Sequence, residues 1–353
     1  MQFKSLAQPT GATTMARQPE HLLHGGNLDA ARQRFPTAPE PWIDLSTGIN
    51  PYPYSVPLLD PETWSRLPQR SQELLLREAA AQCYRAQNPD MIVSASGTQA
   101  LIQTLPRLIA RSQVAILSPT YTEHATAWRH EGHYVVEVPD LTTIARASVV
   151  IVVNPNNPTG QVIPTERLRE LAAELQSRDG LLVVDEAFAD VMAPDVSLVP
   201  DLPPATIVLR SFGKMYGLAG LRLGFAIAHE DLATGLRDYL GPWAVSGPAL
   251  SIGATALADI AWRNEAVMRL ENAQRRLDKL LETCGGCSVI GGTPLFRLVT
   301  HSEATKVADA LAQHGILVRQ FSYAPTWLRF GLPGAEEAWQ RLEQALRTIG
   351  ANT

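Results

Sequence analysis

VVIVVNPNNPTG, at residues 149–160, joins five consecutive β-branched apolar residues to a tight turn rich in proline and asparagine. An uninterrupted run of this kind indicates a strand that is buried on both faces of a sheet. Such runs alternate with helical patterns, and we expect further strands at 92–94, 114–117, 134–138, 181–184, 207–209 and 223–227. The alternation predicts an α/β fold whose mostly parallel seven-stranded sheet is covered by helices on both faces.

The chain has 353 residues, more than one hydrophobic core usually holds. We expect an N-terminal arm at 1–55, a large domain at 56–242 and a smaller α+β C-terminal domain at 243–353. In the large domain, Thr165 is expected to cap a helix and Pro106 to kink or end another. In the small domain we expect strands at 295–299 and 316–318, a helix at 302–314 and a closing helix from Glu336. The first ~20 residues are polar, and we expect partial disorder there.

The composition is that of an ordinary globular protein, with 45% hydrophobic residues and a net charge of -5. No basic run and no apolar stretch of about 20 residues occurs, which argues against nucleic-acid and membrane partners. The N-terminus lacks the apolar core of a secretory signal, and three cysteines are too few for a disulfide framework. We therefore expect a cytoplasmic protein. Cys284 and Cys287 flank two glycines, which we interpret as a turn, and we expect no metal site.

Five polar features follow expected strands, and their coincidence points to a functional site. Ser96, Gly97 and Thr98 come after the strand at 92–94 and open a helix, so backbone N–H groups and hydroxyls converge where an anion would bind. Tyr121 follows the next strand, and its flat face is suited to cover an aromatic ring. Taken singly, the first feature is better explained by a plain turn and the second by core packing.

The other three features supply an amide, a carboxylate and an amine. Asn157 is held between two prolines, which makes its side chain a rigid hydrogen-bonding group. Asp185 ends an apolar strand, where its burial requires a cation such as a protonated pyridinium. Lys214 lies in a glycine-flanked loop and can form an imine, while Ser211 and Arg222 can hold a phosphate. A turn or a surface lysine would explain each feature alone, so their joint occurrence carries the inference.

Together these residues resemble the fold-type I pyridoxal phosphate (PLP) enzymes, specifically the aspartate-aminotransferase-like class I/II group, over roughly 46–332. The resemblance implies that Lys214 forms a Schiff base with the cofactor, that Asp185 pairs with the ring nitrogen and that Tyr121 stacks on the ring. It assigns further cofactor contacts to Ser96, Gly97, Thr98, Asn157, Ser211 and Arg222. It also implies that Arg329 receives the substrate carboxylate and that the active site forms at the interface of a homodimer.

Two positions depart from the pattern of this group. Phe188 stands where aminotransferases commonly have a tyrosine that bonds the ring hydroxyl, which would leave Asn157 as the main partner of that hydroxyl. Leu67 stands where many relatives carry a tyrosine that reaches the cofactor phosphate of the neighbouring subunit. A contact of that kind between subunits is therefore left open.

The N-terminal arm resembles that of the threonine-phosphate decarboxylases of cobalamin biosynthesis, through HGGN at 24–27 and DLSTGINP at 44–51. The resemblance implies conversion of L-threonine O-3-phosphate to (R)-1-amino-2-propanol O-2-phosphate with loss of carbon dioxide. Consecutive small residues expose backbone donors that suit a phosphate. Arg319 is expected to supply the second cation that a doubly anionic substrate requires. The expected substrate-binding residues are His24, Gly25, Gly26, Asn157, Arg319 and Arg329.

Two other functions remain open. A histidinol-phosphate-type aminotransferase would use the same lysine, arginine and ring contacts, because the reaction depends on which Cα bond stands perpendicular to the cofactor plane. The sequence does not reveal that angle. A non-catalytic PLP-binding regulator would normally need an attached DNA-binding helix-turn-helix, and the segment before His24 is too short and too polar to supply one.

Overall fold

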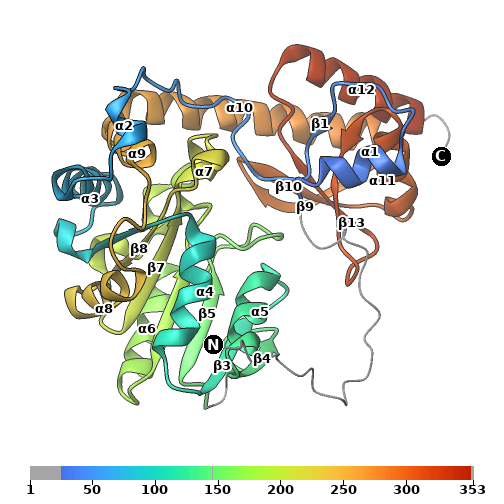
Figure 1. Cartoon of the computed structure of the whole chain (residues 1–353). Helices are drawn as coiled ribbons and strands as arrows, with labels where there is room; N and C mark the ends of the chain where they lie inside the picture. Colours follow the sequence, from blue (N-terminus) through green and yellow to red (C-terminus); the bar gives the residue numbers. More distant parts are fainter. Residues whose placement is uncertain (1–24, 145, 351–353) are drawn as a thin grey trace, which may run out of the picture.

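The computed structural model describes residues 25–144 and 146–350, and it has the α/β architecture expected from the sequence (Figure 1). The central seven-stranded sheet has the order β2-β8-β7-β6-β5-β3-β4. Strand β8 runs antiparallel to both neighbours, and the other pairs are parallel, which confirms a mostly parallel sheet. The strands are β2 (Ile92–Ala95), β3 (Gln113–Leu117), β4 (Tyr134–Val138), β5 (Val149–Val153), β6 (Leu181–Asp185), β7 (Thr206–Ser211) and β8 (Gly224–Ala228).

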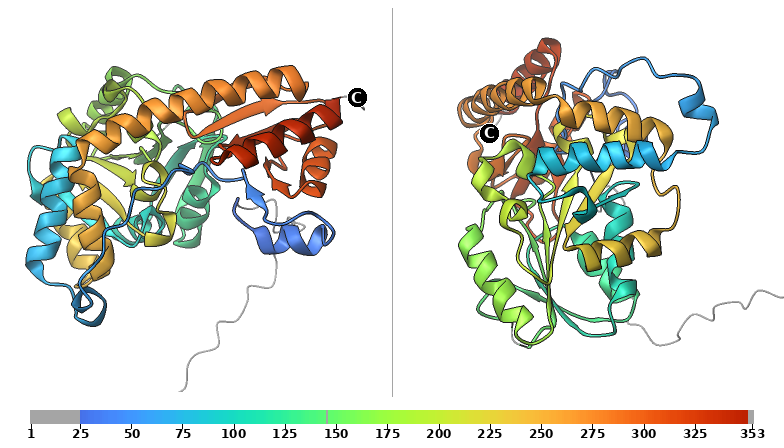
Figure 2. Two further views of the ribbon diagram at one scale, coloured as in Figure 1. Left: turned by 90° about the horizontal axis from the view of Figure 1, so that it is seen from above. Right: turned by 90° about the vertical axis from the view of Figure 1, so that its left-hand side faces the viewer.

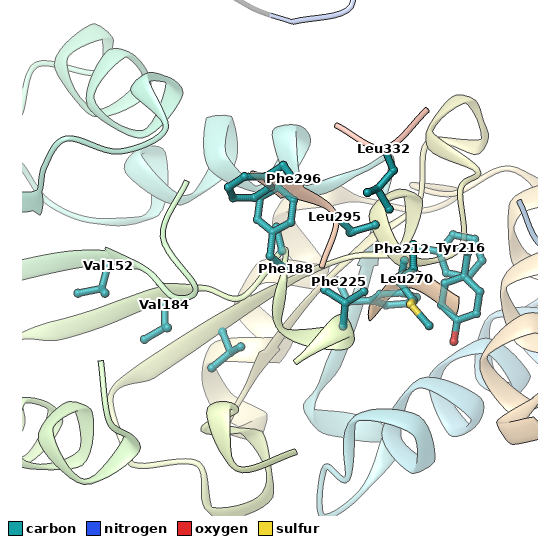
Figure 3. Close-up of a cluster of buried hydrophobic side chains, with 14 of the residues drawn as sticks. Val152, Val184, Phe188, Phe212, Tyr216, Phe225, Leu270, Leu295, Phe296 and Leu332 are labelled. Atoms are coloured by element: carbon teal, nitrogen blue, oxygen red, sulfur yellow. The ribbon is translucent and has the colours of Figure 1, made fainter. Parts of the chain in front are cut away.

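The sheet separates two hydrophobic cores, because successive side chains of a strand point to opposite faces. In β5, Val149 and Ile151 belong to one core, and Val150 and Val152 belong to the other. Helices therefore lie on both faces of the sheet (Figure 2), and part of the larger core is drawn in Figure 3. The first core contains side chains of α4 (Thr98–Leu108), α5 (Thr122–His130) and α8 (Glu230–Leu240). The larger core contains side chains of α3 (Arg70–Tyr84), α6 (Thr165–Gln176), α9 (Gly247–Ala258) and α10 (Ile260–Cys284).

Helix α10 runs from the large sheet to a second, antiparallel sheet at the right of Figure 1. The order of this sheet is β12-β13-β10-β9, formed by β9 (Ser288–Thr293), β10 (Phe296–Thr300), β12 (Arg319–Gln320) and β13 (Trp327–Gly331). Helix α11 (Ala304–Gln313) packs against β12 and β13, and α12 (Glu336–Gly350) packs against α10 and α11. The N-terminal arm, with α1 (Leu28–Arg34), joins this part of the chain because β1 (Ile43–Asp44) pairs in parallel with β11 (Ile316–Leu317).

Some expected elements differ from the structure in detail. The strand expected at 316–318 is shorter, because β11 ends at Leu317 and pairs with the arm. A separate strand, β12, begins at Arg319 and pairs with β13. Thr165 is the first residue of α6 and does not cap it, because the preceding Pro164 holds the cap position without a side-chain hydrogen bond. Helix α4 continues through Pro106 and ends two residues later, at Leu108, as a proline near a helix end allows.

The boundary between the large and the small domain at residue 242 stays a prediction. Helix α9 follows that residue and packs against α3 of the large domain. None of the helices in the described part of the chain combines the length and the apolar character that crossing a membrane requires.

Candidate active site

A cavity of about 290 Å³ opens at the carboxyl ends of the parallel strands. Residues of the arm, of the loops after β2, β3, β5, β6 and β7, and of the second sheet border it together. His24 lies outside the described residues. The expected site residues that line the cavity are Gly25, Gly97, Thr98, Tyr121, Asn157, Asp185, Ser211, Lys214, Arg222, Arg319 and Arg329.

Lys214 lies in α7 (Phe212–Met215), a single helical turn that follows β7, and its side chain lines the cavity. Burial, together with the positive charge of Arg329, lowers the pKa of Lys214 from 10.5 to about 8, while Asp185 acts in the opposite direction. The lower pKa increases the fraction of free amine near neutral pH. A free amine is what imine formation and proton transfer at this position require.

Asp185 ends β6, is only 3% exposed and receives support from two sides. The backbone N–H of Ala187 donates to Oδ1 at 3.0 Å, and His124 Nε2 lies 2.9 Å from Oδ2. His124, on α5, is itself 1% exposed. An N–H on His124 Nε2 orients the carboxylate of Asp185, which lines the cavity. His124 was not anticipated from the sequence. It follows Tyr121 by three residues and therefore lies on the same face of the first turn of α5.

Arg329 and Asn157 meet in the cavity from different sheets. Arg329 Nη1 donates to Asn157 Oδ1, and Nη2 donates to the backbone carbonyl of Ser46 at 2.6 Å. Because the amide oxygen of Asn157 accepts from the guanidinium, the NH₂ group of the same amide is the part that can donate to a ligand in the cavity. Burial, and then the charge of Arg319, lower the pKa of Arg329 to about 10. Arg329 Nε is buried without a hydrogen-bond partner among the described residues, as a donor awaiting an anionic ligand would be.

The loops before α4 and before β8 meet at one end of the cavity. Gly97 has a φ of +85°, and a Cβ there would lie 2.7 Å from Arg222 Nη2, so glycine is what allows the guanidinium to approach. Thr98 begins α4, where backbone N–H groups lack partners within the helix. Ser211 ends β7 beside them. A helix N-terminus, hydroxyl groups and a guanidinium are the groups that hold a phosphate.

Ser96 differs from the expectation for this phosphate end. Its Oγ donates to the backbone carbonyl of Ala244 at 2.7 Å, and Ser96 does not line the cavity. The loop between α8 and α9 passes beside Ser96 and supplies this acceptor. Gly26 also lies outside the cavity lining. Its N–H donates to Ser46 Oγ at 2.7 Å.

Tyr121 is fixed by a short chain of hydrogen bonds. Its hydroxyl donates to Gln99 Oε1 at 3.2 Å, and Gln99 Nε2 donates to Glu123 Oε2 at 2.8 Å. Burial, and then the charge of Glu123, raise the pKa of Tyr121 to about 12, so the phenol is neutral at physiological pH. Its ring therefore acts as an oriented apolar wall of the cavity. Gln99, which also lines the cavity, was not anticipated because glutamine in the first turn of a helix is unremarkable.

Arg319 enters the cavity from β12, next to Phe321 and Tyr323. Its guanidinium carbon lies 5.5 Å from the ring centroid of Phe321, a cation–π distance. Phe188 lines the cavity with its ring edge-on to Phe296 at a centroid distance of 4.9 Å, and Lys214 Nζ lies 5.6 Å from the centroid of the Phe188 ring. Tyr323 was not anticipated, since its position depends on the turn between β12 and β13.

This arrangement fits the cofactor that the sequence resemblance implies. An amine, a carboxylate, an amide, an aromatic face and a phosphate-binding end surround one cavity, each on the end of an element that fixes it. Arg319 and Arg329 reach the same cavity from β12 and β13 of the second sheet.

Comparisons with known proteins agree with this geometry. The chain is 42% identical to a threonine-phosphate decarboxylase of Pseudomonas aeruginosa, over 92% of this chain and 97% of that one. It is 44% identical to a threonine-phosphate decarboxylase of Sinorhizobium sp., over the same shares of the two chains. The fold is similar to that of a histidinol-phosphate aminotransferase from Sinorhizobium meliloti in complex with pyridoxal-5'-phosphate. The TM-score is 0.78 at 20% identity, covering 98% of this chain and all of that one. Residues 40–349 match aminotransferase class I and II, and the chain belongs to this family.

Proposed function

We propose that this chain is a PLP-dependent enzyme that decarboxylates L-threonine O-3-phosphate to (R)-1-amino-2-propanol O-2-phosphate, a step of cobalamin biosynthesis. The observation that carries the proposal is that Lys214 shares one cavity with Arg319 and Arg329, in addition to the Arg222 assigned to the cofactor phosphate. A substrate with both a carboxylate and a phosphate requires two cations, and guanidinium groups bind both kinds of anion with paired hydrogen bonds. The two relatives at 42% and 44% identity, named for this reaction, support the same choice.

Each cofactor group has a partner in this proposal. Thr98, Ser211 and Arg222 hold the phosphate, Tyr121 covers the ring, and Asn157 donates to the ring hydroxyl. Asp185 holds the proton on the ring nitrogen, and His124 fixes the carboxylate in that position. When bound, the cofactor supplies an electron sink for the electron pair left on Cα by a broken bond.

Lys214 is the proton donor in the reaction. Loss of carbon dioxide leaves an electron pair on Cα, and one proton must replace the carboxylate there. The ammonium form of Lys214 can deliver that proton, and its pKa of about 8 means that it can gain and lose a proton near neutral pH. Arg329 holds the carboxylate before it leaves. Arg319 holds the phosphate together with the Gly25–Gly26 turn of the arm, whose Gly25 lines the cavity.

A histidinol-phosphate-type aminotransferase is the alternative that shares most of these contacts. The structural likeness to such an enzyme, at 20% identity, reflects the fold alone. The assay for the proposal is incubation of the purified PLP-loaded enzyme with threonine phosphate, with and without 2-oxoglutarate. We expect release of carbon dioxide that does not depend on 2-oxoglutarate. Amino transfer to 2-oxoglutarate without carbon dioxide release would refute the proposal.

We further propose a homodimer in the cytoplasm. Large apolar side chains are exposed near α2 (Glu62–Ser65) and α3, including Leu58 at 102%, Trp64 at 70% and Leu67 at 61%. Contiguous exposed apolar groups are typical of an interface with another protein. Cys83, Cys284 and Cys287 are free thiols, which suits a reducing compartment. Sedimentation equilibrium tests the dimer, and a monomer at all concentrations would contradict it.

A further inference from the structure

Ser46, in the N-terminal arm, connects two segments that border the cavity. It is 2% exposed and uses three polar groups at once. Its Oγ accepts from the N–H of Gly26 at 2.7 Å and donates to Asp44 Oδ1 at 2.5 Å, and its own N–H donates to the same oxygen at 2.8 Å. Its carbonyl accepts from Arg329 Nη2 at 2.6 Å. One buried residue, Ser46, therefore contacts both the Gly25–Gly26 turn and Arg329.

The glycine turn is packed tightly on Ser46. A Cβ placed on Gly25 would lie 2.3 Å from the carbonyl oxygen of Ser46, the same oxygen that holds Arg329. Gly26 has a φ of +86°, a left-handed conformation that a side chain would disfavour. The turn can therefore not move toward Ser46, and the hydroxyl of Ser46 keeps it from moving away. Gly25 in turn lines the cavity.

We propose that Ser46 is a positioning residue that sets the distance between the two anion sites of the substrate. It holds the Gly25–Gly26 turn through its side chain and Arg329 through its backbone, so the selectivity for an amino acid that carries both a carboxylate and a phosphate depends on it. This inference rests on the proposed function for the identity of the two anions. Ser46 itself does not line the cavity.

Ser46→Ala separates the two contacts, because it removes the hydroxyl and leaves the carbonyl that holds Arg329. The N–H of Gly26, an exposed residue, then loses its acceptor in the protein, and the loss of an ordinary hydrogen bond corresponds to about a fivefold change in a binding constant. We expect the dissociation constant for threonine phosphate to rise about fivefold and that for unphosphorylated threonine to stay within about twofold. Both are measured by titrating the PLP-loaded enzyme and following the absorbance of the lysine-bound cofactor.

The chain offers a matched control in Thr142. There, Oγ1 donates to Asp140 Oδ1 at 2.5 Å and the backbone N–H donates to the same oxygen at 2.8 Å, as Ser46 does with Asp44. This turn is exposed and follows β4, away from the cavity lining. Thr142→Ala should leave both dissociation constants unchanged. An equal effect of Ser46→Ala on both ligands, or no effect on either, would overturn the proposal.

Gly25→Ala tests the link from the other direction. The added methyl group must displace the Ser46 carbonyl, and with it Arg329, so the affinity for unphosphorylated threonine should fall as well. A variant that weakens only the phosphorylated ligand would contradict the link. These titrations measure binding and not turnover, so they remain informative if the enzyme transfers the amino group. In that case the proposed function would be refuted, and the titrations would still show whether Ser46 links the glycine turn to Arg329.

Discussion

His124→Leu removes the imidazole that lies 2.9 Å from Asp185 Oδ2, while leucine fills much of the same volume. Asp185 would keep the backbone N–H of Ala187 at Oδ1 and lose its partner at Oδ2. A hydrogen bond to a charged group contributes roughly 1.5–3 kcal/mol, and about 1.4 kcal/mol corresponds to a factor of ten. Affinity for the ring-protonated cofactor should therefore fall about 10- to 150-fold.

The assay is an absorbance titration of the cofactor-free protein with PLP, followed by kcat at saturating cofactor. His133→Leu is the matched control, because His133 is 6% exposed and its Nε2 lies 2.9 Å from the carbonyl of Pro106, outside the cavity. That variant should lose stability and keep its cofactor affinity. If both variants lose the same affinity, or if His124→Leu binds the cofactor normally, the role given to His124 is wrong.

Three further predictions follow from the same geometry. Because the pKa of Lys214 is lowered to about 8, the rate at which cofactor-free protein captures PLP should rise with pH around a midpoint near 8; a midpoint near 10.5 would contradict this. Arg319→Gln should raise the KM for threonine phosphate about tenfold or more and change the KM for threonine little. Arg329→Gln should raise the KM for both substrates, and steady-state kinetics on the two substrates separates these outcomes. Arg210→Met should lower the free energy of unfolding in urea by about 3–5 kcal/mol, because it leaves a buried carboxylate without its partner. Arg210 Nη1 lies 2.9 Å from Glu186 Oε2, and both side chains are buried. A decrease below about 1 kcal/mol would contradict this prediction.

The sequence predicts the sheet and the residues at its edge for a physical reason. Strands buried on both faces have continuous apolar runs, and a polar residue directly after such a run must lie where the parallel strands end. Lys214, Asp185 and Asn157 follow strands in this way, and the cavity contains all three. Their relative positions depend only on the order of neighbouring strands.

Residues whose position depends on packing between distant segments were harder to predict. Ser96 has an acceptor in Ala244, which no local pattern indicates. His124 and Gln99 lie within ordinary helical turns, and their importance comes from Asp185 and Tyr121, on other elements or loops. Tyr323 depends on how β12 and β13 pair, and the division between β11 and β12 depends on the arm.

The central claim is that carbon dioxide leaves Cα and that Lys214 replaces it with a proton. The most direct measurement is conversion of threonine phosphate by the PLP-loaded enzyme in deuterated water, followed by NMR and by carbon dioxide release. We predict one carbon dioxide for each substrate consumed and one deuterium on the carbon that carried the carboxylate, with both lost in Lys214→Ala. Formation of glutamate from 2-oxoglutarate, with the carboxylate of the substrate retained, would contradict the account.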